Sequence, residues 1–95
     1  MNQYLLLIHG DTPSRPTAEE WTRFFTAAKD SGMFRGGSEI GARTMLGRQP
    51  TSSSLPLTGY MRFDTDDKPR LLQLLAQHPV VVHGGTVELC ELPKS

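Results

Sequence analysis

The segment that most constrains the fold is residues 3–9, Gln-Tyr-Leu-Leu-Leu-Ile-His, which is apolar on both faces of a predicted β-strand. Successive side chains of a strand point to opposite sides. Leu5 and Leu7 therefore share one face, and the other face consists of Tyr4, Leu6 and Ile8. A strand with two apolar faces is normally covered on both. Two helices can cover one face of a small sheet, so the other face calls for a partner, most simply a second copy of the chain.

Size and composition limit the class of protein. The 95 residues make one domain, spanning 1–95. Ten basic and ten acidic residues cancel, which argues against nucleic acid or an anionic membrane surface as the partner. The apolar run near the start is too short for a membrane span and lacks the basic lead of a signal segment. The single cysteine, Cys90, cannot form an internal disulfide, and we expect a cytoplasmic protein.

The first helix is predicted to begin at Thr17, because Thr17-Ala18-Glu19-Glu20 has the form of a capping box. Gly32 can take the left-handed conformation that closes a helix. Between them, apolar residues recur at the spacing of a single helix face. The predicted buried face consists of Trp21, Phe24, Phe25 and Ala28.

A second helix is predicted after the acidic segment 64–67, which supplies a cap. It should end near Gln77, because Pro79 disfavours helical geometry at His78. Its predicted buried face consists of Leu71, Leu72, Leu74, Leu75 and Ala76.

Three further strands are predicted, at residues 33–41, 57–63 and 86–92. The first of these should be bent or bulged at Gly36-Gly37. Residues 47–54 are rich in turn formers and predict a loop. Residues 80–82 are three valines between a proline and two glycines, and we interpret them as a connecting turn.

The predicted order is therefore β-α-β-β-α-β. Right-handed crossovers place both helices on one face of a four-stranded antiparallel sheet, which is the ferredoxin-like α+β arrangement. The first and third strands are central in this topology, and the doubly apolar first strand suits that position.

Short matches along nearly the whole chain resemble the YCII-related, or DGPF-domain, family of small bacterial proteins. The matching residues are Tyr4–Asp11, Glu20-Trp21, Gly32, Gly36-Gly37, Gly59-Tyr60 and His78–Leu89. The resemblance implies a ferredoxin-like fold that pairs sheet to sheet as a homodimer, giving a dimeric α+β barrel. The Asp-Gly-Pro-Phe signature is absent from this chain. Some family members are suspected enzymes with a His–Asp dyad, but Trp21 and His78 stand at those two positions here.

Four residues are candidates for chemistry near one sheet edge. His9 and Asp11 lie where the first strand ends. His78 and His83 flank the turn before the last strand, and the first and last strands are neighbours in this fold. A histidine beside a carboxylate can act as a general base, so His78 or His9 is the candidate base and Asp11 its orienting group. Alternatively, His9 and His78 form hydrogen bonds to loop backbone, and Asp11 caps a turn through its own main chain.

The candidate ligand-binding residues are Trp21, Tyr60, Glu39 and His83. Trp21, Phe24 and Tyr60 are candidates to line an apolar pocket between helix and sheet, or simply to form core. Glu39 can pair with Arg35 or complete a polar rim. Three histidines and Asp11 would suffice for zinc, but their spacings match no established motif, so we expect neither metal nor cofactor.

Two hypotheses follow. The first is a dimeric, non-catalytic module that binds a small molecule or accompanies a regulator. The second is a cofactor-independent enzyme that acts by acid–base chemistry on a small aromatic or lactone-like compound. Hydrogen-bond reach between a histidine and Asp11, at a real cavity, would favour the enzyme.

Overall fold

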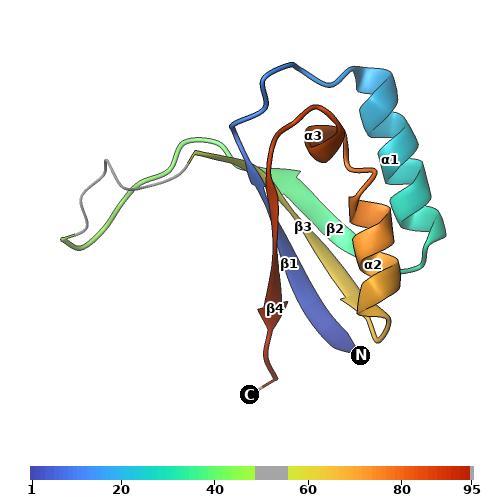
Figure 1. Cartoon of the computed structure of the whole chain (residues 1–95). Coiled ribbons are helices and arrows are strands. Elements are labelled where there is room, and N and C mark those ends of the chain that lie inside the picture. Colours follow the sequence, from blue (N-terminus) through green and yellow to red (C-terminus); the bar gives the residue numbers. More distant parts are fainter. Residues whose placement is uncertain (49–55, 95) are drawn as a thin grey trace.

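A computed structural model of the chain describes residues 1–48 and 56–94, so residues 49–54 of the predicted 47–54 loop lie outside the described part. The elements in chain order are β1 (Asn2–His9), α1 (Ala18–Asp30), β2 (Phe34–Glu39), β3 (Leu57–Thr65), α2 (Lys68–Leu75), α3 (Pro79–Val82) and β4 (Val87–Leu92). The strands form one sheet in the order β2-β3-β1-β4, and every neighbouring pair is antiparallel. The three helices lie on the same side of this sheet (Figure 1). The ferredoxin-like α+β prediction is confirmed.

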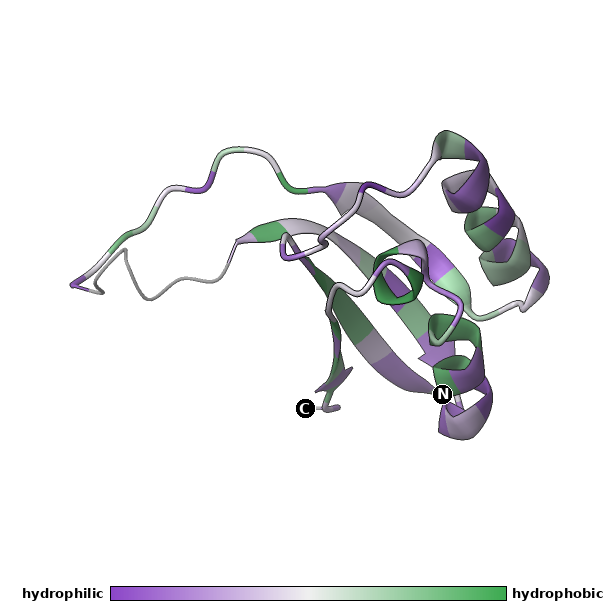
Figure 2. Cartoon of the chain, turned by 45° about the horizontal axis from the view of Figure 1, so that its top comes forward, coloured by the Kyte–Doolittle hydropathy of each residue, from purple (hydrophilic) through white to green (hydrophobic). Residues whose placement is uncertain are grey.

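Strand β1 occupies the centre, as its two apolar faces predict. Tyr4, Leu6 and Ile8 are buried toward the helices, and Leu6 lies opposite Met61 of β3. Leu5 and Leu7 are only half-buried on the other side, which we call the open face. No helix lies on that side of the sheet in the described chain (Figure 1), and Figure 2 shows the apolar residues of the strands.

Helix α1 has the predicted ends. The Glu20 N–H donates to the Thr17 hydroxyl at 3.2 Å, and the Thr17 N–H donates to the Glu20 carboxylate at 3.0 Å, completing the capping box. Gly32 follows the helix with a φ of 75°, in the left-handed region. The buried face is narrower than predicted: Phe24 and Ala28 are buried, but Phe25 is 36 % exposed. The helix contacts the core through the side that carries Phe24 and Ala28, and Phe25 projects to one side of this contact.

The region around Pro79 differs from the prediction. Residues 79–82 form a short helix, α3, rather than a connecting turn. Pro79 has a backbone angle suited to a first helical position, and His78 caps the turn by accepting the Val80 N–H at 3.2 Å. His78 itself has an extended ψ of 133°, as expected before proline. Capping and proline here outweigh the β-propensity of three valines.

The buried face of α2 is also narrower than predicted. Leu71 and Leu75 are buried, Leu74 is half-buried, and Leu72 is 49 % exposed, with Ala76 exposed as well. An eight-residue helix presents about two turns to the core. Leu72 and Ala76 each follow a buried leucine by one residue, so they are turned about 100° away from the side of α2 that contacts the core.

The predicted bulge in β2 is confirmed. The pairing with β3 shifts register between Phe34 and Gly37, and Gly36 has a φ of 106°. The strand is shorter than the predicted 33–41. Among residues 1–48 and 56–94, no helix has both the length and the hydrophobicity needed to span a bilayer.

Candidate functional site

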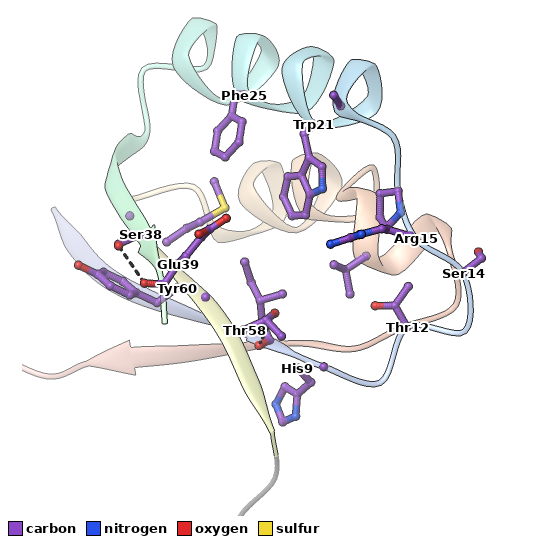
Figure 3. A pocket seen from close by; sticks show the side chains of 18 of the residues that line it. His9, Thr12, Ser14, Arg15, Trp21, Phe25, Ser38, Glu39, Thr58 and Tyr60 are labelled. Carbon is purple, nitrogen blue, oxygen red and sulfur yellow. Dashed lines mark hydrogen bonds between the residues drawn. The ribbon is translucent and has the colours of Figure 1, made fainter. Parts of the chain in front are cut away.

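A cleft of about 900 Å³ opens between the first half of α1, the loop 10–16 and the sheet strands β1, β2 and β3 (Figure 3). Binding sites for small molecules run from roughly 300 to 1,000 Å³, so this cleft has room for such a ligand. It forms because α1 packs on the core through Phe24 and Ala28 while its neighbouring face stands over the sheet.

One side of the cleft is aromatic. Trp21 and Phe25 stack with ring centroids 5.8 Å apart, and Phe25 lies 6.1 Å from Phe34. We call these three side chains the aromatic wall. Trp21 and Phe25 project from α1 into the cleft (Figure 3). The sequence predicted Trp21 at such a cleft, whereas Phe24, another of the three predicted lining residues, is buried in the core instead.

Two charged side chains reach into the cleft from opposite ends. Arg15 extends from the loop beneath Trp21, and Glu39 rises from the end of β2 (Figure 3). Of the two readings of Glu39, the polar rim is the observed one, because Arg35 pairs instead with Asp64 at 3.4 Å. Tyr60 borders the cleft, but it pairs with Leu7 and Ser38 across the sheet, so its ring lies on the open face (Figure 3).

His78, the first candidate base, is fully buried. Its ring packs edge-on against Trp21, with ring centroids 5.2 Å apart, and at a tilt of 60° against Phe24, with centroids 4.6 Å apart. Because Nδ1 accepts the Val80 N–H, the neutral ring carries its proton on Nε2, which has no hydrogen-bond partner in the described chain. Burial lowers the pKa of His78 to about 4. The residue is a neutral helix cap.

His9 and Asp11 form hydrogen bonds with other residues and not with each other. His9 Nε2 lies 3.0 Å from the Glu88 carboxylate across β1 and β4. Asp11 accepts the Thr86 N–H at 2.9 Å and the Thr86 hydroxyl at 2.7 Å, and this hydroxyl lowers the pKa of Asp11. Asp11 therefore secures the turn before β4. No hydrogen bond joins a histidine to Asp11 in the described part of the chain.

His83 takes part in a hydrogen-bonded chain that sequence reasoning missed. Its Nδ1 lies 2.7 Å from Ser14 Oγ, and its Nε2 lies 2.6 Å from Glu20 Oε2. We call this the Ser14–His83–Glu20 relay. Because β1 and β4 are neighbours, the loop after β1 lies beside the segment before β4. Ser14 is three residues after Asp11 on this loop, so the topology brings it near His83 as well. The capping box was the signal that Glu20 would have a fixed orientation.

Other candidate chemistries have no support in the geometry. Nowhere in the described ranges do three or more His, Cys, Asp or Glu side chains gather so as to hold a metal ion. Burial raises the pKa of the half-buried Cys90 thiol, which disfavours the reactive thiolate. No family model matches the chain, and no curated protein matches it.

Proposed function

We propose that this chain is a dimeric, cytoplasmic ligand-binding module of the YCII-related kind, which takes up a small compound with an aromatic part in the cleft beneath α1. The aromatic wall carries this proposal. Phe25 is 36 % exposed and Trp21 is half-buried, although both belong to the apolar face of their helix. Aromatic side chains gain substantially when such surface is removed from water. A flat apolar ligand would fill the space that the core leaves open.

The two charges define the polar part of such a ligand. Neither Arg15 nor the Glu39 carboxylate has an ion-pair partner in the described chain, and both reach into the cleft (Figure 3). A guanidinium binds carboxylates through two parallel hydrogen bonds, and a carboxylate binds ammonium groups. The cleft therefore suits an aromatic compound with an acidic group, a basic group or both. The alternative acid–base enzyme, with His78, His9 or Asp11, receives no such support from the geometry.

Binding can be measured through Trp21, the only tryptophan of the chain. We expect 1-anilinonaphthalene-8-sulfonate, an aromatic anion, to bind saturably and to change the Trp21 fluorescence. Phe25→Ala should weaken this binding about tenfold, because one aromatic contact of roughly 1.5 kcal/mol is removed. Leu72→Ala is the matched control, since Leu72 is an exposed apolar residue outside the cleft. Equal effects of the two substitutions would refute binding in the cleft.

The dimer proposal depends on the open face. Leu5 lies between Arg62 and Cys90, and Leu7 lies between Tyr60 and Glu88. The apolar members of this face are half-buried in the single chain, and they are Leu5, Leu7, Tyr60, Cys90 and Leu92. A second sheet laid over them would bury the side chains that the helices leave uncovered.

We expect Leu5→Lys to convert the protein to monomers, because the substitution places a charge at the centre of the proposed interface. Light scattering over a dilution series measures the change in mass. Leu72→Lys is the control, since it introduces the same charge on the helical side of the molecule. A wild-type protein that is monomeric throughout the series, or a Leu5→Lys dimer as stable as the wild type, would contradict the proposal.

A further inference from the structure

We propose that Ser14 is a nucleophile activated by His83 and oriented through Glu20, and that the chain transfers or hydrolyses the acyl group of small carboxylic esters held at the rim of the cleft. This goes beyond the proposed binding function, because it assigns a reaction. It involves none of the three candidates that the sequence singled out for catalysis.

When His83 is neutral, the hydrogen bonds of the relay determine which atom carries each proton. The Glu20 carboxylate only accepts, so His83 Nε2 carries a proton and donates it across 2.6 Å. The neutral imidazole then has a lone pair on Nδ1, and the Ser14 hydroxyl must donate to it across 2.7 Å. A serine hydroxyl that donates to a histidine, which in turn donates to a carboxylate, is the arrangement that activates a serine for nucleophilic attack.

Glu20 is well placed to hold His83 in this form. One carboxylate oxygen accepts the Thr17 N–H in the capping box, and the other faces His83. The Thr17 amide and then the His83 ring lower the pKa of Glu20, so the carboxylate stays ionised at neutral pH. The His83 and Glu20 side chains are 20 % and 27 % exposed, so the pair is shielded on most sides. Glu20 is thus a positioning residue.

The relay adjoins the cleft. Ser14 is one of the residues that line it and lies at its outer rim, on the loop that also carries Arg15 (Figure 3). In the proposed reaction, an ester that contacts the aromatic wall extends past Arg15 to bring its carbonyl carbon to this rim. Ser38 also borders the cleft, but its side chain shares the open face with Tyr60. Its hydroxyl donates to the backbone carbonyl of Glu39 at 2.9 Å and has no histidine partner among the described residues. The structure thus contains an ordinary serine for comparison.

The proposed reaction has two steps. Ser14 Oγ forms a bond to the carbonyl carbon while its proton passes to His83 Nδ1, and the carbon–oxygen bond to the alcohol breaks as that proton moves to the leaving oxygen. A water molecule then attacks the acyl-serine and gives its proton to His83. The carboxylic acid leaves and Ser14 recovers its proton. The only co-reactant is water.

Labelling with an alkyl fluorophosphonate tests the nucleophile directly. The Ser14 oxygen displaces fluoride from phosphorus, and the serine proton passes to His83. Peptide mass spectrometry should locate the adduct on Ser14 and not on Ser38. Ser14→Ala should abolish the label, and release of p-nitrophenolate from p-nitrophenyl acetate should fall with it.

Glu20→Gln is the sharpest variant, because glutamine also serves at this position of a capping box and α1 should remain folded. Its amide group can donate to His83 Nε2, which moves the ring proton to Nδ1 and removes the acceptor for Ser14. We expect labelling to slow by about 10²-fold or more while the melting temperature stays close to that of the wild type. The proposal is overturned if Ser14 reacts no faster than Ser38, or if Glu20→Gln labels at the wild-type rate. Ligand binding measured through Trp21 can succeed or fail independently of either result.

Discussion

Gly37→Ala is expected to destabilise the protein by at least about 2 kcal/mol, the largest effect that we predict for any single methyl group. A Cβ atom at Gly37 would collide with the backbone carbonyl oxygen of Tyr60 and lie 3.0 Å from Met61 Cα. Both atoms belong to β3, which is hydrogen-bonded on its two sides and cannot retreat. The added methyl group must therefore break the pairing of β2 with β3 just after the bulge. The loss is measured as the decrease in the free energy of unfolding in urea, with the same dependence on urea concentration for the variant and the wild type.

Gly41→Ala is the matched control for this substitution. It adds the same methyl group two residues after the end of β2, where a Cβ would meet no atom of residues 1–48 or 56–94 within 4 Å. We expect its stability to stay within about 0.5 kcal/mol of the wild type. Because Gly37 also lines the cleft, the folded fraction of Gly37→Ala should bind the naphthalene probe poorly. Equal stability of the two variants would contradict the close approach of β2 to β3.

Acidification should destabilise the protein through His78 by up to about 3 kcal/mol. Burial lowers the pKa of His78 from 6.5 to about 4, so the unfolded chain takes up this proton first. The contribution to stability is complete above pH 6.5 and is lost as the pH falls through that window to about 4. The free energy of unfolding in urea, measured across this range, should decrease accordingly.

His78→Asn isolates the contribution of this one group. Asparagine can still cap α3 through its side-chain oxygen, but it does not titrate. The variant should be less stable at neutral pH because it loses the ring that packs on Trp21 and Phe24. Its stability should nevertheless change less with pH between 4 and 6.5 than that of the wild type. The carboxylates whose pKa is lowered, Asp11 and Glu20, are present in both proteins and cancel. An unchanged pH dependence would show that His78 is accessible to protons in the folded state.

The fold was predictable because its determinants are local. Alternation in residues 3–9, the capping box at Thr17 and the glycines at 32 and 36–37 each specify a conformation within a few residues. The four-residue helix at Pro79 was missed because the flanking proline and glycines were interpreted as the limits of a turn, whereas the proline and the histidine before it are also signals for a helix start. The width of the buried helix faces was overestimated for another reason. Periodicity locates an apolar stripe, but it does not say how much of the stripe the neighbouring element covers.

The candidate site was predictable only in its neighbourhood. The topology brings the loop after β1 beside the segment before β4, as the sequence argument expected, and it places Trp21 and Glu39 at a cleft. The side-chain directions in the loops decide which polar atoms come into contact there. Loop sequences have no periodicity from which these directions can be predicted. Asp11 thus bonds Thr86 rather than a histidine, and His83 bonds Ser14 and Glu20.

The loop 10–16, which forms one wall of the cleft, is held by hydrogen bonds to the segment just before β4. Thr86 holds Asp11 across 75 positions, and His83 holds Ser14 across 69. Residues 83–86 must therefore be synthesised before these hydrogen bonds can form. A nascent chain that stops short of these residues lacks the hydrogen bonds that hold this wall of the cleft in place.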